Sequence, residues 1–552
     1  MTRLSTLVLV LVACSSSRVP DARFANQAPV GVVDDRRDVP VAPAERKATT
    51  TYLLYNYDGV FHRPITRRLE LPGPQRALGV NALDEVPDST WFTNRIGVRE
   101  LSLDELRTGP ATIESPELHK PWTVLSTRTG GTTVGFVIRD ARGEKFLLKL
   151  EMNGYPELET ATDAIVDRLL WAIGYNVPEN HVVYVHPRDL VLAPDATSED
   201  LLGHKRRLDR AALAERLTLC DFGSDGTLRA LASRVLDGKP LGGHPQEGTR
   251  SDDPNDRIAH ERRRDLRGAY PIFAWLDHVD ATEVNTLDMW VTDPVDPKRH
   301  YVKHFLLDFG KSFGVMATMG RDKRRGHAYR VDLTEILSSL FLVGAVERDW
   351  EQRGAPPLRG VGLFEATSYE PGRWKPNYRY MPFVVAEERD KFWGAKLLMR
   401  FTPEQLRAAV EAGRYTDPRA AEYVTDVLIA RQRATALYWF ERVAPLDRFA
   451  VDGDKLCFDD LTVAYKLAPV QTQTRYTARY HDGNGKLLAA TNGLGPDANG
   501  RGCAPLGLAR SADGYNIIEL AVTRGNGGAR VFVHVARDGA AGTARVIGIW
   551  RP

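Results

Sequence analysis

The chain has 552 residues, more than one hydrophobic core ordinarily organises, so two or three domains are expected. Apolar residues make up 43% and charged residues 26%, which is a globular composition. The net charge of +2 gives no reason to expect nucleic acid as a partner.

The first 13 residues have the layout of an export signal. A basic start, MTR, precedes the apolar run LSTLVLVLVA, which is too short to span a bilayer, and Cys14 follows. This order resembles a bacterial lipoprotein signal, which implies a lipid anchor on Cys14 and a location at the cell envelope. Serines follow Cys14, which by the same resemblance favours the outer membrane where two membranes are present. An ordinary apolar N-terminal segment is the alternative.

Residues 14–48 are rich in Pro, Ala, Arg and Asp and show no apolar periodicity, which predicts a flexible tether. Three cysteines remain beyond Cys14. In an exported protein two cysteines within one small domain would pair, and Cys457 with Cys503 is the candidate disulfide. Cys220 would then be a buried, inert thiol.

The range from 121 to 186 predicts three strands, a helix and a fourth strand. The strands lie in WTVLSTRTGGTTVGFVIRDARGEKFLLKLE, separated by the turns TGGTT and DARGE. Apolar residues at helical spacing follow from Leu158 to Ile173, and Gly174 is a natural stop. The run HVVYVH is the next strand.

The polar range 186–265 predicts a peripheral insertion with one short helix. A helix then leads to LDHVDATEVNTLD, and KRHYVKHFLLDFG predicts a strand that ends near Asp308. Beyond about residue 320 the pattern is helical, with a capping box at Thr402 and Gln405 and a helix start at Asp417. Residues 446–552 are short alternating runs separated by Gly, Asn and Asp, which predict a small β-sandwich-like domain.

Lys149 is the candidate catalytic lysine. It ends the strand KFLLK on the same face as Leu147 and would bind phosphates. Its expected partner is Glu159 on the following helix, which lies roughly 80° from the centre of the apolar arc, against roughly 120° for Glu157. Gly130, Gly131 and Gly135 in GGTTVG would let a hairpin backbone approach the phosphates.

Three further residues complete a candidate phosphoryl-transfer site. Asp280 would orient the attacking group or accept its proton, and Asn285, five residues on, would hold a metal ion. Asp308 would be the main Mg²⁺ ligand, with Phe309 packed beneath it, because carboxylate and amide oxygens suit Mg²⁺. ATP and Mg²⁺, with Mn²⁺ as an alternative ion, are therefore the expected cofactors.

Lys149, Glu159, Asp280, Asn285 and Asp308 occur in the order typical of the protein-kinase-like superfold, and LLDFGKSFG resembles HipA-like, phosphoinositide and CotH-like kinases. Longer stretches, among them LWAIGYNVPEN and HERRRDLRGAYPIFAWLDHVD, resemble a family of bacterial exported proteins. The resemblance implies an α+β, two-lobed kinase-like fold over residues 49–445. A β-rich N-lobe would span about 49–186, the insertion about 186–265 and a helical C-lobe about 266–445, before the all-β domain.

Two departures from the kinase pattern concern the binding of phosphate and the compensation of its charge. The turn TGGTTVG is not a full kinase glycine loop, and Val279 stands where arginine is usual. His278 is expected to brace its loop, as the resemblance implies, and the other histidines lack the spacing of a zinc site.

Two functions remain open. The first is an ATP- and Mg²⁺-dependent phosphotransferase, or adenylyltransferase, acting on a protein, lipid or small molecule. The second is a membrane-anchored scaffold that keeps the kinase-like frame without turnover. The expected location at the cell envelope favours the scaffold, because ATP is scarce outside the cytoplasm. Retention of five polar residues favours the enzyme, because buried charges without a partner or metal are costly.

Overall fold

The computed structural model describes residues 19–20, 23–46, 57–69, 76–128, 133–199, 204–320, 322–342, 347–468, 474–507, 511–524, 527–537 and 542–552. The predicted signal, Cys14, Gly130 and Gly131 lie outside these residues. The chain divides into two compact units. The larger consists of Val30–Asn81 and Glu85–Arg442, and the smaller of Met1–Pro29, Ala82–Asp84 and Val443–Pro552.

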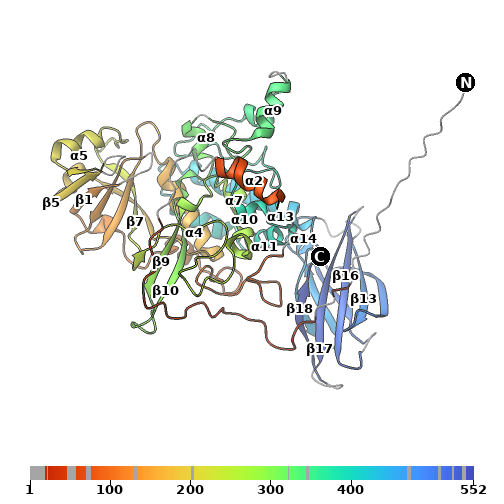
Figure 1. The fold of residues 1–552 in the computed structure, drawn as a ribbon. Helices are drawn as coiled ribbons and strands as arrows, with labels where there is room; N and C mark the ends of the chain where they lie inside the picture. The colour runs from red at the N-terminus through yellow and green to blue at the C-terminus, as the bar shows by residue number, and fades with distance from the viewer. Residues whose placement is uncertain are drawn as a thin grey trace, which may run out of the picture. The chain divides into compact units, whose positions relative to one another are not determined.

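A seven-stranded sheet organises the first half of the larger unit (Figure 1). Its strand order is β4-β7-β3-β2-β1-β5-β6, and all neighbours are antiparallel except β1 and β5. The strands are β1 (Trp122–Thr127), β2 (Gly135–Arg139), β3 (Lys145–Leu150), β4 (Asn180–Val185), β5 (Leu190–Glu199), β6 (Lys205–Arg207) and β7 (Leu228–Arg234). The fold is therefore mixed α and β, built on one large sheet.

The two faces of this sheet bury different residues. In β3 the side chains of Phe146, Leu148 and Leu150 enter one apolar core, which α5 (Arg210–Leu217) also contacts. Helix α4 (Leu158–Ile173) covers the other face, where its Ala164 packs on Val182 and Leu231. Gly174 ends α4 at φ 144°, as the sequence predicts. The period of two in β3 thus directs Lys149 toward α4.

The prediction that residues 186–265 form a peripheral insertion is wrong. Strand β7 comes from this range and lies inside the sheet between β4 and β3, and β5 pairs with β1. The sequence LRALASR is short and flanked by polar segments, so its character as a central strand is visible only from its two neighbours.

The predicted tether also needs correction within its described part, residues 23–46. In the larger unit, Asp35 accepts hydrogen bonds from the backbone N–H and the hydroxyl of Thr90, and the N–H groups of Val39 and Arg46 donate to backbone carbonyls. In the smaller unit, Arg23 pairs with Asp513 at 2.8 Å. These contacts involve mainly backbone groups and single side chains, so they produce no periodic pattern of apolar residues in the sequence.

The rest of the larger unit contains further helices joined by long irregular segments. The helices are α2 (Arg63–Leu69), α3 (Leu103–Thr108), α6 (Arg264–Arg267), α7 (Ala269–Leu276), α8 (Val315–Gly320), α9 (Leu333–Leu342), α10 (Met381–Val384), α11 (Glu388–Leu398), α12 (Pro403–Glu411) and α13 (Pro418–Phe440). Helices α7, α11 and α13 pack on one another, and α12 contacts both α13 and α4. A small sheet, β8 (Lys239–Pro240), β9 (Thr286–Thr292) and β10 (His300–Leu306), carries the candidate site residues at the ends of β9 and β10.

The smaller unit contains two antiparallel sheets that share one apolar core. One holds β11 (Leu446–Asp452), β12 (Lys455–Asp460) and β15 (Arg501–Pro505); the other holds β13 (Arg475–Asp482), β14 (Leu487–Leu494), β16 (Tyr515–Arg524), β17 (Gly527–Arg537) and β18 (Ala544–Trp550). Within residues 446–552, predicted as short strands throughout, Leu461–Ala464 form the helix α14, which Asp460 caps by accepting from the N–H of Thr462.

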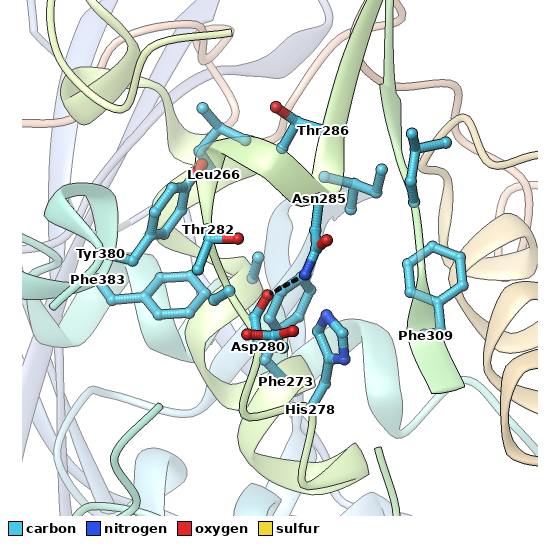
Figure 2. Close-up of a pocket in the computed structure, with 14 residues that line it drawn as sticks. Leu266, Phe273, His278, Asp280, Thr282, Asn285, Thr286, Phe309, Tyr380 and Phe383 are labelled. Atoms are coloured by element: carbon cyan, nitrogen blue, oxygen red, sulfur yellow. Dashed lines mark hydrogen bonds between the residues drawn. The ribbon is translucent and has the colours of Figure 1, made fainter. Parts of the chain in front are cut away.

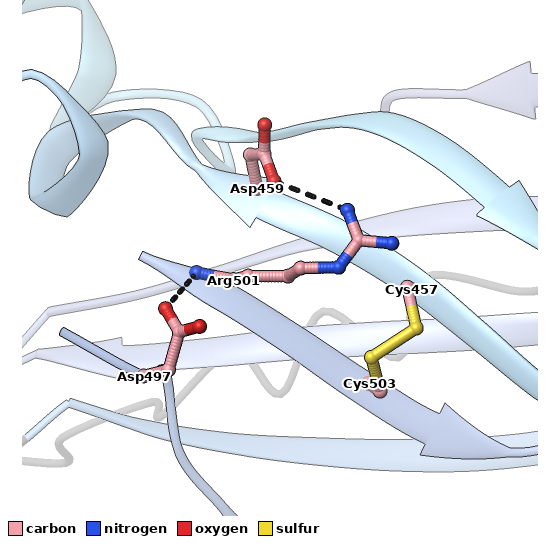
Figure 3. Close-up of a disulfide and its surroundings, with 5 residues drawn as sticks. All are labelled: Cys457, Asp459, Asp497, Arg501 and Cys503. Carbon is pink, nitrogen blue, oxygen red and sulfur yellow. Dashed lines mark hydrogen bonds and ion pairs between the residues drawn. A yellow bond between two sulfur atoms is a disulfide. The ribbon is translucent and has the colours of Figure 1, made fainter. Parts of the chain in front are cut away.

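A disulfide joins Cys457 and Cys503, which face each other on β12 and β15 (Figure 3). Beside it, Arg501 reaches Asp459 across the same strand pair, at 3.8 Å. Cys220 is a buried free thiol, and burial raises its pKa to about 12. No helix in the described part of the chain has the length and apolar character needed to cross a lipid bilayer.

Candidate active site

Lys149 lies between two carboxylates that come from distant parts of the chain. Its Nζ is 3.2 Å from Oδ2 of Asp163 on α4 and 2.8 Å from Oδ1 of Asp308 after β10. Burial alone would lower the pKa of Lys149, but the two carboxylates outweigh it and raise the pKa. The lysine is therefore a fixed ammonium group at neutral pH.

The partner predicted for Lys149 is wrong. Glu159 does not pair with Lys149, because it forms an ion pair with Lys311 instead. Asp163 lies one turn further along α4 on nearly the same face, and its second oxygen accepts a hydrogen bond from Asn180 at 3.0 Å. The helical period correctly predicts which face of α4 meets Lys149, but it does not predict which turn. Asp163, four residues after Glu159, lies on nearly the same face and points in a similar direction.

Asp308 takes a left-handed backbone conformation, φ 59°, directly before the one-turn helix Phe309–Lys311. Its Oδ2 accepts a 3.3 Å hydrogen bond from Arg128 at the end of β1, while Oδ1 faces Lys149. Burial would raise the pKa of Asp308, but these cations lower it to about 2. The carboxylate therefore stays ionised over the whole physiological pH range. Phe309 beneath it is fully buried.

Asp280 and Asn285 occupy one loop between α7 and β9, as Figure 2 shows. The Asn285 side-chain amide donates to the backbone carbonyl of Asp280 at 2.8 Å, and the backbone carbonyl of Asn285 accepts from the N–H of Leu307. Burial raises the pKa of Asp280, and hydrogen bonds from Asn285 and Asn377 partly oppose this. A carboxylate with a raised pKa is suited to accept a proton.

His278 braces this loop, as predicted from the resemblance. Its Nδ1 lies 2.9 Å from the hydroxyl of Ser312, and its ring packs edge-on against Phe273 and Phe309. Burial lowers its pKa to about 4, so the ring is neutral at physiological pH. His278 thus ties the Asp280 loop to the segment that follows Asp308.

A small pocket lies behind the same loop (Figure 2). Asp280, Asn285, His278 and Phe309 line it together with apolar side chains, and its cavity volume of about 20 Å³ is close to the room that one water molecule needs. A nucleotide does not fit there. Lys149 and Asp308 do not line this pocket, so it is separate from the cluster of charges around Lys149.

The residues present offer oxygen ligands to a divalent cation. Asp308 supplies an ionised carboxylate, and the amide of Asn285 donates through Nδ2, which leaves its Oδ1 as a metal ligand. Of the predicted phosphate-binding glycines, Gly135 begins β2, and its carbonyl accepts from the N–H of Arg128. A Cβ at Gly135 would lie 2.7 Å from the carbonyl oxygen of Leu148, so the close strand pairing here requires glycine.

Three functional candidates escaped the sequence reasoning: Asp163, Arg128 and Asn377. The sequence does carry a signal for Asp163, because a residue four positions after Glu159 lies on nearly the same face of the helix. Arg128, two residues before Gly130, supplies a cation beside Asp308, and the loop of Asp280 has Val279 at the position where kinases usually have arginine. Asn377 lies 97 residues after Asp280, and no local signal marks it.

A second cluster of polar residues is buried at β9 and β10. The ligand atoms of His244, Asp288 and His304 lie within 4.8 Å of one another, close enough for a metal ion. The two imidazoles, however, share the same Asp288 oxygen at 3.3 and 2.7 Å, and Arg250 bonds the other oxygen. Because the guanidinium neutralises the carboxylate and repels a cation, we interpret the cluster as a buried hydrogen-bond network.

The geometry defines a site of one buried lysine, two carboxylates on it and an adjoining Asp–Asn loop. No protein-family model matches this sequence, and neither does any curated protein. Solved structures similar to it include the proinflammatory kinase CtkA of Helicobacter pylori, with 9% identity over 57% of this chain and 94% of that one, at a TM-score of 0.29.

Two other kinases are also similar in part. The Golgi casein kinase with Mn/ADP bound shares 12% identity over 61% of this chain and 73% of its own, at a TM-score of 0.29. The Rio2 kinase of Chaetomium thermophilum, in an ADP/Mg²⁺-phosphoaspartate complex, shares 14% over 56% and 72%, at a TM-score of 0.23. TM-scores this low do not establish a common fold.

Proposed function

We propose that this chain is a kinase-like phosphotransferase that uses ATP and Mg²⁺ or Mn²⁺, anchored to the cell envelope through Cys14. The observation that supports it best is the Lys149 ammonium held between Asp163 and Asp308, with Asp280 and Asn285 on the adjoining loop. Phosphoryl transfer needs such positioned charges more than covalent chemistry.

Each residue has a role in this proposal. Lys149 and Arg128 bind phosphate oxygens, Asp308 and Asn285 hold the metal ion, and Asp280 orients the acceptor hydroxyl and receives its proton. The bound metal would neutralise charge on the phosphates. Asp163 positions Lys149, and His278 positions the Asp280 loop. The acceptor is a protein, a lipid or a small molecule, and adenylyl transfer is a variant of the same chemistry.

A catalytically inactive scaffold is the second candidate, and one observation favours it. Both oxygens of Asp308 already have cationic partners, Lys149 and Arg128. A metal ion at Asp308 must therefore displace Arg128, which is costly unless a nucleotide phosphate receives the guanidinium.

The deciding experiment is a thermal-shift titration of the chain from Ser15 onward, which lacks the lipidation site at Cys14, with ATP and Mg²⁺ or Mn²⁺. We expect a metal-dependent rise in melting temperature that Asp308→Asn abolishes and Asp452→Asn, at an exposed aspartate of β11, preserves. Transfer of label from γ-labelled ATP would then establish turnover. Absence of a shift with every metal–nucleotide pair would favour the scaffold.

The anchor is tested separately. We expect the full chain to fractionate with membranes, and Cys14→Ser to release it without changing nucleotide binding. Recovery of wild-type protein in the soluble fraction, with an unmodified N-terminal cysteine, would contradict the proposed anchor.

A further inference from the structure

The larger unit contains a cavity of about 680 Å³ that shares no lining residue with the Lys149 cluster. Its lining comes from Gly326–Glu335, Glu347–Arg353 and Glu365–Arg379, with Lys391 of α11 and Arg431 of α13 at its walls. Its volume is in the range of about 300–1,000 Å³ that small-molecule sites occupy. Aromatic side chains, among them Trp350, Tyr369 and Trp374, line it.

Most cations of this cavity are already paired with carboxylates. Arg348 lies 2.8 Å from Glu335, Arg353 lies 3.1 Å from Glu365, and Arg373 lies 3.2 Å from Glu370. Lys375 lies 2.7 Å from Asp332. The buried Arg431 donates to the carbonyls of Glu365 and Ala274 and packs on Tyr369. These groups need no ligand.

Two cations of the cavity are exceptions. Within the described residues, neither Arg379 nor Lys391 forms a close ion pair with a carboxylate, although Asp390 and Glu388 act on Lys391 at longer range. The Arg379 guanidinium lies 4.8 Å from the ring centre of Tyr329, and its Nε is buried without a hydrogen-bond partner. The Lys391 ammonium lies 4.8 Å from the ring of Tyr270 and 5.2 Å from that of Trp439. Aromatic faces compensate a desolvated cation only in part, so both groups retain capacity to bind an anion.

The cavity is also linked to the Asp280 loop. Trp374, in its wall, donates through Nε1 to Asp277 at 2.8 Å. Asn377, two residues before Arg379, donates its N–H to the carbonyl of Val279 at 2.6 Å, and its side chain bonds the Asp280 carboxylate. A ligand on Arg379 would therefore hold the segment that also holds Asp280.

We propose that this cavity binds a small organic anion, with Arg379 and Lys391 as the groups that hold its carboxylate or phosphate and the aromatic walls covering an apolar or planar part. The proposed anion site does not depend on the proposed phosphotransfer. It rests on the cavity and on two cations without close ion pairs, and neither observation assumes catalytic activity. If the chain is a kinase, the same ligand stabilises the Asp280 loop through Asn377.

Calorimetric titration of the chain from Ser15 onward with phenyl phosphate, phenylacetate and neutral benzyl alcohol tests the proposal. We expect one or both anions to bind and the alcohol not to. The tighter anion identifies the phosphate or the carboxylate as the preferred group. Arg379→Gln and Lys391→Gln should each weaken binding about tenfold or more. Arg373→Gln, an exposed cation of the same cavity, and Asp308→Asn should leave it unchanged.

Two results would overturn the proposal. One is absence of binding of either anion at millimolar concentration. The other is binding that persists in both Arg379→Gln and Lys391→Gln, or that Asp308→Asn abolishes, since the anion would then occupy the Lys149 cluster. Near-ultraviolet circular dichroism of each variant shows that a loss of binding is not a loss of folding. Failure of ATP to bind would leave this test unaffected.

Discussion

The Nζ of Lys149 lies 2.8 Å from Oδ1 of Asp308, although 159 residues separate them in the chain. Because Asp163 faces the same ammonium, one positive charge separates a buried and a partly buried carboxylate. Arg128 is a second partner of Asp308 and Asn180 a second partner of Asp163, but Lys149 contacts both carboxylates, so the lysine supports both the stability of the larger unit and the proposed nucleotide site.

Replacing Lys149 should be strongly destabilising. Lys149→Met leaves Asp163 and Asp308 facing each other, and we expect the free energy of unfolding of the larger unit to fall by about 3–5 kcal/mol. Urea unfolding followed by tryptophan fluorescence measures this. Arg373→Gln, which breaks an exposed pair, should cost about 0–1 kcal/mol. Equal losses in the two variants would contradict the central position of Lys149.

Asp163, rather than Glu159, should control nucleotide binding. Asp163→Asn removes one of the two charges that hold Lys149, so we expect ATP affinity to fall about tenfold or more. Glu159→Gln, on the same helix one turn earlier, only releases Lys311 and should have a smaller effect. Calorimetric titration with ATP and Mg²⁺ compares the two. A larger effect of Glu159→Gln would restore the partner predicted from the sequence.

His244 should make stability depend on pH. Burial lowers its pKa from 6.5 to about 4, so below pH 6.5 the unfolded chain takes up a proton that the folded chain does not. The contribution of His244 to the free energy of unfolding is fully present above pH 6.5. It decreases by about 1.4 kcal/mol per pH unit as the pH falls toward 4.

Urea unfolding of wild type and His244→Gln between pH 7.5 and pH 5 isolates this contribution from those of other groups. The stability difference between the two proteins should shrink as the pH falls. Val295→Ala, at an exposed side chain that does not titrate, is the control and should keep a constant difference. A constant difference for His244→Gln as well would contradict the assignment.

The disulfide should stabilise the smaller unit alone. Cys457 and Cys503 enclose a separation of 46 residues, and Cys503→Ser should lower the unfolding free energy of this unit by about 2–5 kcal/mol. Differential scanning calorimetry should show one transition moving to lower temperature. ATP binding should not change, because the Lys149 cluster belongs entirely to the larger unit. A shift of both transitions would show that the two units unfold together.

The sequence alone determined the elements that carry the site. The periods of two and 3.6 predicted the strand that ends near Lys149 and helix α4 with its stop at Gly174, and the capping signals at Thr402 and Asp417 predicted the starts of α12 and α13. These features depend on residues within one or two turns of each other, so local chemistry suffices to specify them.

Only the tertiary structure decided which charges meet. Periodicity gave the face of α4 but not the turn, so Asp163 replaced Glu159 beside Lys149, and the partners Arg128 and Asn377 come from other elements. The place of β7 inside the sheet and the contacts of residues 23–46 likewise depend on distant neighbours. A strand buried on both sides and a segment held by its backbone carry little pattern of their own, because their partners are distant in the chain.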